Sequence, residues 1–283
     1  MRDVLYRFFW RGVLVSGINA LYLRVAPRRL VLLGYHSVSR LENARELKGD
    51  LYRHLSVPAD VFERQMQYLK DHGYTCISFA DLAAIERKER LMPAHPVIVY
   101  FDDGYRDNFV NAYPILKKME IPATLFIAVD CVEGRGNPWG ATVSDVAGVF
   151  LSWDEIRNMK DIFSFGTHTM SHRKLVNLPP EEVRRECAES RRIIEERTGE
   201  PVVAISYPKS RWNLEVRGIA EDLGFSYILS HDRGVNYGPP YKFLNKIPVG
   251  PRDTFVLFRA KLGLYYRLVR LLRRLIFIQP VRE

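Results

Sequence analysis

Two adjacent carboxylates follow directly after an apolar run. Residues 96–101 (PVIVYF) are rich in β-branched and aromatic side chains, which is typical of a strand buried on both faces in a parallel sheet. Asp102, Asp103 and Gly104 come next. Asp-Gly is common in ordinary turns, but in α/β folds the carboxyl end of a buried strand is where ligands and catalytic groups gather. We therefore treat both aspartates as candidate site residues.

A second motif, GTHTMSH, covers residues 166–172 and carries His168 and His172 four residues apart. One helical turn after a strand would let both imidazoles face the same way, although two nearby histidines are more often a polar surface pair. Asp103, from another strand end, would complete a His-His-Asp set with an open position, as in catalytic metal sites. Asp102 would point elsewhere, because neighbouring side chains of an extended chain diverge, and could act as a general base.

Strand and helix patterns alternate along the chain and would position these motifs. Repeated β-then-α units predict a parallel sheet, and this many units favour a closed or nearly closed barrel whose strand ends share one face. We expect strands at residues 30–35, 74–78, 96–101, 123–129, 162–166, 202–206, 226–230 and 243–249, and helices at 60–72, 81–90, 107–119, 151–159, 180–198 and 214–223.

Composition narrows the class of protein. The 283 residues are 47% hydrophobic and 27% charged, which is normal globular usage and excludes a disordered chain. The three cysteines lack the spacing of a metal site or of a disulfide framework, which favours a reducing compartment. The net charge of +9 would attract nucleic acid, anionic lipid or acidic glycans alike.

Both ends of the chain interleave arginine with bulky apolar residues, so we divide it into 1–29, 30–256 and 257–283. Neither end has the ~20 uncharged apolar residues of a membrane span, and no clear cleavage site of a signal peptide follows the first apolar run. We predict basic amphipathic helices that hold the protein on an anionic membrane surface, on its cytoplasmic side. The alternative is that both segments pack on the barrel and extend their arginines into water.

Three motifs in this order, YFDDG at 100–104, THTMSH at 167–172 and ISYPKS at 205–210, resemble the polysaccharide deacetylase family, the carbohydrate esterases with a NodB homology domain. The likeness runs from about residue 31 to 249 and is greatest to the branch that deacetylates poly-N-acetylglucosamine. It implies that 30–256 is the catalytic domain, a distorted (β/α) barrel of about seven parallel strands. The implied activity is removal of N-acetyl groups from an N-acetylhexosamine glycan or a lipid-linked sugar.

The resemblance also implies roles for individual residues. Asp103, His168 and His172 would hold a divalent metal, for which we predict zinc, and Asp102 would be the general base. The family's third motif usually reads Arg-x-Pro-aromatic, whereas this chain has Ser206-Tyr207-Pro208-Lys209 and so lacks the arginine that braces the base. We still assign Tyr207, Pro208 and Lys209 to the substrate and oxyanion site, because the backbone N–H of Lys209 could serve as the donor.

The family's late Leu-x-His motif, whose histidine protonates the leaving amine, has no clear match. His36 and His231 follow predicted strands and are the candidates, with His36 preferred, and each could equally be a structural histidine.

Three other functions compete with the deacetylase. A catalytically impaired relative would only bind glycan, and retention of Asp102, Asp103, His168 and His172 argues against it. An O-acetyl esterase would use the same chemistry and stays open. A basic nucleic-acid- or lipid-binding protein rests on charge alone and is disfavoured, because the excess charge is terminal and no nucleic-acid motif is visible.

Overall fold

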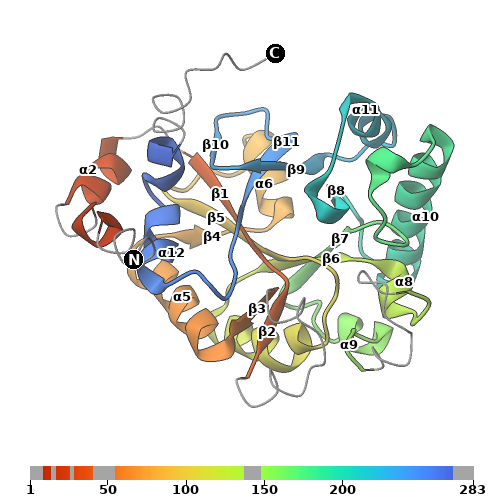
Figure 1. Ribbon diagram of the computed structural model, residues 1–283, viewed down its shortest axis with the longest axis horizontal. Coiled ribbons are helices and arrows are strands. Elements are labelled where there is room, and N and C mark those ends of the chain that lie inside the picture. Colours follow the sequence, from red (N-terminus) through yellow and green to blue (C-terminus); the bar gives the residue numbers. More distant parts are fainter. Residues whose placement is uncertain (1–8, 14–16, 26–28, 41–54, 137–147, 270–283) are drawn as a thin grey trace.

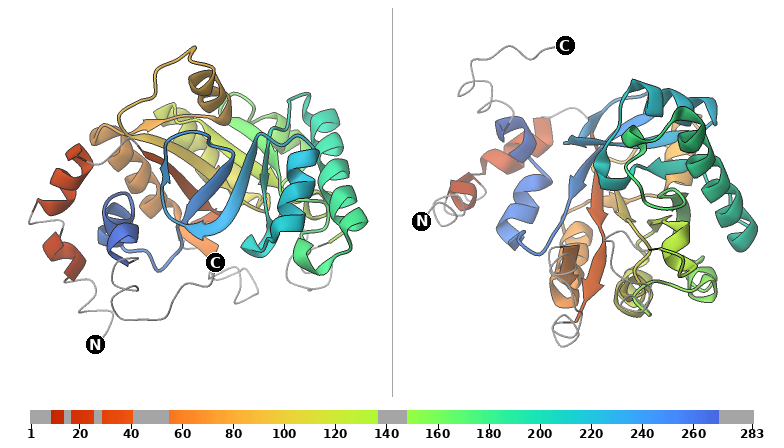
Figure 2. Two further views of the ribbon diagram at one scale, coloured as in Figure 1. Left: turned by 90° about the horizontal axis from the view of Figure 1, so that it is seen from above. Right: turned by 45° about the vertical axis from the view of Figure 1, so that its right-hand side comes forward.

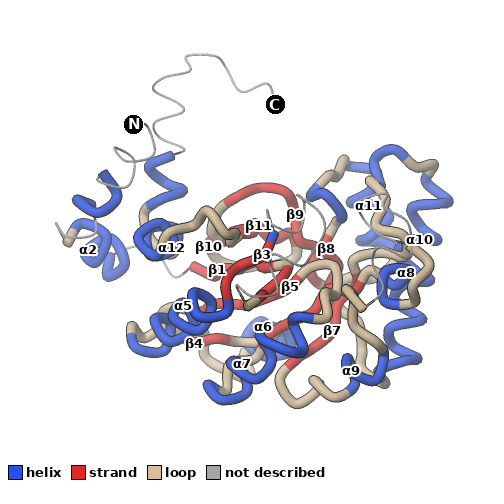
Figure 3. Tube along the Cα trace, turned by 60° about the horizontal axis from the view of Figure 1, so that its bottom comes forward, coloured by secondary structure: helices blue, strands red, loops and turns tan. Residues whose placement is uncertain are grey.

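A computed structural model of the chain describes residues 9–13, 17–25, 29–40, 55–136 and 148–269. Its centre is a closed ring of seven parallel strands, which pair in the order β1-β5-β6-β7-β8-β9-β11 and back to β1. Figure 3 shows these strands inside a layer of helices. The expected barrel of about seven parallel strands is confirmed. The strands are β1 (Arg29–Tyr35), β5 (Pro96–Phe101), β6 (Ala123–Ile127), β7 (Phe163–Thr167), β8 (Ala204–Ser206), β9 (Tyr227–Arg233) and β11 (Phe243–Pro248).

Helices surround the ring (Figure 1). In two further views, α2 and α12 lie side by side at one end of the molecule and α10 and α11 at the opposite end (Figure 2). The predicted helix at 107–119 begins as a short π-helix, Asn108–Ala112, before continuing as α7. The helices are α2 (Ile18–Val25), α5 (Ala59–Asp71), α6 (Phe79–Glu86), α7 (Tyr113–Met119), α8 (Val129–Val132), α9 (Trp153–Arg157), α10 (Pro180–Thr198), α11 (Leu214–Asp222) and α12 (Phe255–Lys261).

Alternate residues of each strand belong to two different cores. On β5, Val97, Val99 and Phe101 join the apolar layer between the barrel and the helices, whereas Ile98 and Tyr100 belong to the cluster that fills the barrel. The same alternation holds on β1, β6, β8, β9 and β11, as expected for a barrel. Helix α6 contributes to the inner cluster through Phe79 and Leu82.

Short strands supplement the ring. Of the predicted strand 74–78, only β4 (Thr75–Cys76) forms, and it pairs with the start of β5, whereas β6 pairs with the later residues of β5. β10 (Asn236–Tyr237) runs antiparallel to the start of β1, and β2 (Ser37–Ser39) pairs with β3 (Ser56–Pro58) outside the main sheet. Among the described residues, Thr167 and Ile205 are the single pair in register between β7 and β8.

The described parts of the two terminal segments pack together. Asn19 Oδ1 accepts a hydrogen bond from Leu264 N at 2.9 Å, and the rings of Trp10 and Tyr265 lie 4.9 Å apart. Phe258 of α12 is buried in the outer core. Residues 1–8, 14–16, 26–28 and 270–283 of the predicted terminal segments lie outside the described residues. Within the described ranges, every helix is too short or too polar to be a transmembrane segment.

Candidate active site

A cavity of about 330 Å³ opens at the carboxyl ends of the barrel strands. A larger cavity of about 820 Å³ lies between α5 and α12 but contains none of the predicted site residues, so chemistry rather than size identifies the site. The smaller cavity is lined by Gly34, His36, Leu55, Tyr100, Asp102, Asp103, His168, His172, Tyr207, Lys209, Ser210, Arg233, Lys246 and Pro248.

The two adjacent aspartates reach this cavity through different backbone conformations. Asp102 continues the inward alternation of Ile98 and Tyr100, and its N–H donates to Tyr35 O at 2.9 Å. Asp103 has a φ of 78°, in the left-handed region, so the chain leaves the extended conformation there. The expected divergence of neighbouring side chains therefore does not separate them, and both buried carboxylates line one cavity.

His168 follows the end of β7 with a fixed ring orientation. Its backbone N–H donates to Ile127 O at 2.8 Å on β6. Its Nδ1–H donates to the carbonyl oxygen of Ser206 at 2.6 Å on β8. Because Nδ1 carries the proton, Nε2 keeps its lone pair, and this atom lies 3.3 Å from Asp103 Oδ1.

His172 reaches the same oxygen without the helical turn expected from the sequence. Residues 169–172 form an irregular loop in which Thr169 and His172 have φ values of 70° and 55°. Glu186 of α10 holds this loop, because its carboxylate accepts hydrogen bonds from Ser171 N at 2.9 Å and from Ser171 Oγ. His172 Nε2 lies 3.2 Å from Asp103 Oδ1.

These three buried side chains form a set of donors that fits a divalent metal ion. One ligand atom from each of Asp103, His168 and His172 lies within 4.8 Å of the others. Among the described residues, Asp103 Oδ1 and His172 Nδ1 are buried and make no hydrogen bond. A buried oxygen left in this way is costly unless a cation or a donor meets it. One carboxylate and two imidazoles are also common ligands of zinc.

The electrostatics of the set favour the forms that bind metals. Burial raises the pKa of Asp103, but its interactions with His172 and His168 together outweigh burial and hold this pKa well below its usual value. Burial lowers the pKa of His172 despite the nearby carboxylate of Asp103. At neutral pH the set therefore presents a carboxylate and a neutral imidazole, the deprotonated states that metal binding requires.

Asp102 lies beside this set and also meets a buried cation. Its Oδ1 is 3.8 Å from His168 Nδ1, and its Oδ2 is 3.7 Å from Lys246 Nζ. Lys246 is on β11, and its ammonium group also donates to Ser206 Oγ at 3.4 Å. The sequence prediction did not include Lys246. The signal was a lysine at an inward-facing position of a predicted strand, two residues after Leu244.

The remaining predicted site residues differ in whether they line the cavity. His36 and Lys209 line the cavity, and so does the buried Tyr207, whose hydroxyl donates to Val216 O at 3.4 Å. Pro208 is buried next to it but is not part of the cavity lining. His231 lies in β9, and its side chain is outside the described part of the chain. The catalytic roles of His36, His231 and Lys209 stay predictions.

Comparison with known proteins points to one family. A sequence model of the polysaccharide deacetylase family matches residues 90–228. The Bacillus subtilis protein YxkH is 27% identical over 209 residues, which cover 74% of this chain and 66% of YxkH. The poly-beta-1,6-N-acetyl-D-glucosamine N-deacetylase of Staphylococcus aureus is 32% identical over 113 residues, 37% of this chain and 38% of that protein. The chain thus spans less than two thirds of either relative.

The fold agrees with solved deacetylase structures. The structure of the Streptococcus pyogenes deacetylase PplD superimposes with a TM-score of 0.70 at 24% identity, over 84% of this chain and all of PplD. The family match begins before β5 and ends within β9, so it includes Asp102, Asp103, His168 and His172. Since residues 90–228 match the family model and the barrel has the fold of a solved deacetylase, this segment of the chain belongs to the polysaccharide deacetylase family.

Proposed function

We propose that this protein is a divalent-metal-dependent hydrolase that removes N-acetyl groups from an N-acetylated glycan. The observation that carries the proposal is the juxtaposition of two functions in one cavity. Asp103, His168 and His172 bring three ligand atoms together, and the separate carboxylate of Asp102 lies 3.8 Å from one of the same imidazoles. The name of the S. aureus relative, a poly-beta-1,6-N-acetyl-D-glucosamine N-deacetylase, supports this substrate class.

Residues of this chain can be assigned to each step of amide hydrolysis. A divalent ion held by Asp103, His168 and His172, for which we propose zinc, would act as a Lewis acid toward the acetyl carbonyl and a water molecule. Asp102, as general base, accepts the proton of the attacking water. The backbone N–H of Lys209 is the proposed donor to the tetrahedral oxyanion. His36, at the cavity wall, is the proposed donor of a proton to the leaving amine.

The cavity has room for one sugar unit of a glycan rather than for a longer stretch of the polymer. Its volume of about 330 Å³ is at the lower end of the range for small-molecule sites. An N-acetylhexosamine within a longer glycan could place its acetamido group there while the flanking sugars lie outside. A lipid-linked N-acetyl sugar would present the same group.

Acetate release tests the proposal directly. We expect acetate from β-1,6-linked N-acetylglucosamine oligomers or from a lipid-linked N-acetyl sugar, loss of release after chelation, and recovery when zinc is returned. Release from O-acetylated sugars alone would identify an esterase. Oligomer binding without acetate release in the metal-loaded protein would identify a glycan-binding relative and contradict the proposal.

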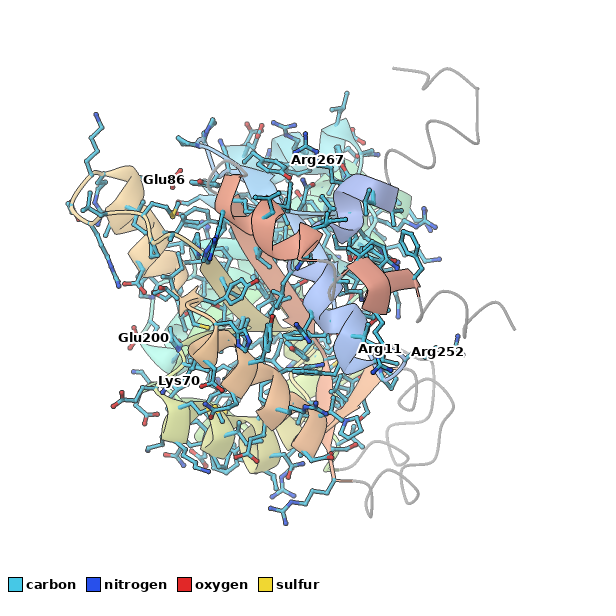
Figure 4. The ribbon with its side chains drawn as sticks, turned by 90° about the vertical axis from the view of Figure 1, so that its left-hand side faces the viewer. Arg11, Lys70, Glu86, Glu200, Arg252 and Arg267 are labelled. Atoms are coloured by element: carbon cyan, nitrogen blue, oxygen red, sulfur yellow. The ribbon has the colours of Figure 1, made fainter. Side chains whose placement is uncertain are left out.

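We also propose that an anionic lipid surface is a partner of the terminal surface, defined here as Phe9, Arg11, Ile18, Leu21, Arg24 and Arg267. Phe9, Ile18 and Leu21 are 51%, 52% and 62% exposed, although they are large and apolar. Arg267 packs on Tyr22 of α2, so both terminal segments contribute to the surface. Figure 4 views this face, with Arg11 and Arg267 labelled.

Charge favours lipid over a neutral partner for this surface. The described residues of 9–25 and 254–269 include no acidic side chain. Each basic residue near an anionic bilayer contributes about 1 kcal/mol, and salt screens this attraction. Exposed apolar side chains between arginines are typical of helices that lie in a membrane interface.

Vesicle flotation tests the lipid proposal. The full chain should float with phosphatidylserine-containing vesicles and much less with phosphatidylcholine vesicles or at high salt. Ile18→Glu combined with Leu21→Glu should abolish flotation. The matched control is Leu91→Glu combined with Leu214→Glu, since these leucines are 89% and 77% exposed elsewhere on the protein. Equal flotation of both double variants, or none by the unmodified chain, would refute the lipid proposal.

A further inference from the structure

Lys246 is a lysine in an unusual place, the interior of the barrel. It stands two residues after Leu244, which belongs to the inner apolar cluster, and only 6% of its surface is exposed. An irregularity in the sheet lies next to it. Leu244 pairs with Leu229, whereas Lys246 pairs with Arg233, so four residues of β9 lie opposite two residues of β11. Such bulges often occur next to active sites, where they redirect side chains.

A buried ammonium group needs compensation, because its transfer out of water is costly. Within the described part of the chain, two contacts of Lys246 Nζ are seen, with Asp102 Oδ2 at 3.7 Å and with Ser206 Oγ at 3.4 Å. Asp102 supplies the negative charge and Ser206 supplies a hydroxyl acceptor. The side chain of Lys246 thus connects β11 with Asp102 at the end of β5 and with Ser206 at the end of β8.

This contact distinguishes the two oxygens of Asp102. Oδ2 faces the ammonium group, and Oδ1 is the oxygen nearer to His168 and has no hydrogen-bond partner among the described residues. At 3.7 Å the lysine contact is one of charge rather than a short hydrogen bond. It can fix the orientation of the carboxylate while leaving Oδ1 directed toward the metal-ligand set.

We propose that Lys246 is the positioning residue of the general base: its buried ammonium group holds Asp102 Oδ2, so that Oδ1 faces the reacting water. The proposal rests on the proposed deacetylase function, since it assigns Asp102 a proton-accepting role. In this proposal Lys246 acts through Asp102, and its contacts among the described residues are with Asp102 and Ser206 rather than with the metal-ligand set.

Single variants give the first test, on metal-loaded protein with N-acetylglucosamine oligomers. Lys246→Met should lower kcat by roughly 10- to 100-fold, as is common when a partner of an active-site side chain is lost, with KM and zinc content nearly unchanged. Lys246→Arg keeps the cation and should lie closer to the unmodified enzyme. Lys242→Met, which removes a half-exposed lysine just before β11, is the control and should have no effect on kcat.

A double-mutant cycle separates positioning from general damage to the fold. In the Asp102→Asn background, Lys246→Met should change the residual kcat by no more than about twofold, because the group on which the lysine acts is gone. If Lys246→Met lowers kcat by the same factor in both backgrounds, the lysine acts independently of Asp102 and the proposal is wrong.

Unfolding measurements keep this proposal distinct from the proposed function. Urea titrations of the same four proteins should show that Lys246→Met lowers the midpoint less in the Asp102→Asn background, because no buried carboxylate is then left unpaired. Additive midpoint shifts would overturn the contact itself. Absence of acetate release by the unmodified enzyme would instead contradict the deacetylase function.

Discussion

The two halves of the barrel interior use the same strands and the same alternation of residues for opposite purposes. Toward the amino end, Leu32, Ile98, Phe126 and Leu229 belong to one closed apolar cluster. Toward the carboxyl end, the inward positions are occupied by polar residues: Asp102 follows Tyr100, Ser206 follows Ala204, and Lys246 follows Leu244. On each of these strands, the inward side chain changes from apolar to polar within two residues. The apolar half therefore supplies most of the stability that holds the polar site in place.

The backbone differs between the halves as well. Seven described residues other than glycine have a positive φ, and five of them, Asp103, Thr169, His172, Lys209 and Ser210, lie in the segments that build the cavity. Such conformations cost of order 1–3 kcal/mol each and persist only when the surroundings impose them. We expect substitutions at the carboxyl end to change function more than stability, and substitutions in the apolar half to do the reverse.

The largest expected effect follows removal of a metal ligand. His168→Ala and Asp103→Asn should both lose stoichiometric metal and reduce acetate release to background, because each supplies one of three buried ligand atoms. Elemental analysis of purified, folded protein measures this. His95→Ala, a half-buried histidine outside the site, is the control. Stoichiometric metal in folded His168→Ala would show that the ligand assignment is wrong.

The next effect separates the two adjacent carboxylates. Asp102→Asn should retain metal and yet lower kcat by the roughly 10²- to 10⁴-fold that is typical of a lost general base. Comparison with Asp103→Asn in the same elemental and acetate assays tests the division of roles, with the exposed Asp154→Asn as control. Similar metal loss in the Asp102 and Asp103 variants would refute it.

The apolar half should respond in stability. Phe126 contacts the rings of Tyr100 and Phe79 and occupies the space next to Gly166. Phe126→Ala should therefore lower the free energy of unfolding by about 3–5 kcal/mol through cavity formation, as measured by urea titration. Metal content of the protein that remains folded should be normal. Metal loss without destabilisation would contradict the separation of the two halves.

The smallest effect concerns Glu186, which holds the His172 loop from outside the cavity. Glu186→Gln should weaken metal affinity by about 10- to 100-fold, as expected for a residue that supports a ligand. Competition with a chelator measures the affinity. Glu189→Gln, on the exposed side of the same helix, is the control, and equal affinity of the two variants would remove Glu186 from this role.

Glu186 also gives a pH dependence of stability with a definite sign. Burial raises its pKa, but the hydrogen bonds from Ser171 and Arg173 outweigh burial, so the folded-state pKa lies below the ordinary value. The stabilisation is then present above the unfolded pKa of about 4.3 and is lost as pH falls through the folded pKa. The stability difference between the unmodified protein and Glu186→Gln should therefore shrink below about pH 4.

The barrel and the site residues at the strand ends could be predicted from the sequence, because both depend on local residue patterns. The run 96–101 and the alternation of apolar segments were sufficient for the barrel, and the strand-end rule brought Asp102, Asp103 and His168 to one face. The left-handed conformations of Asp103 and His172 could not be predicted, because they are imposed by tertiary contacts such as that of Glu186 with Ser171. Lys246 was missed because the alternation along β11 can place it inside the barrel but does not predict its contact with Asp102, which depends on how the strands are arranged around the ring.

The short ladder between β7 and β8 has a consequence for where the barrel opens locally. With Thr167 and Ile205 as the single described pair in register, this seam depends on side-chain support, and the hydrogen bond of His168 to Ser206 crosses it. Amide protons of β8 should exchange with deuterated solvent faster than those of β1 and β5, whose five pairs in register form a longer ladder. Because His168 is also a proposed metal ligand, adding zinc should slow the exchange of the β8 amides selectively. Metal binding would then stabilise the pairing of β7 with β8 that closes the barrel.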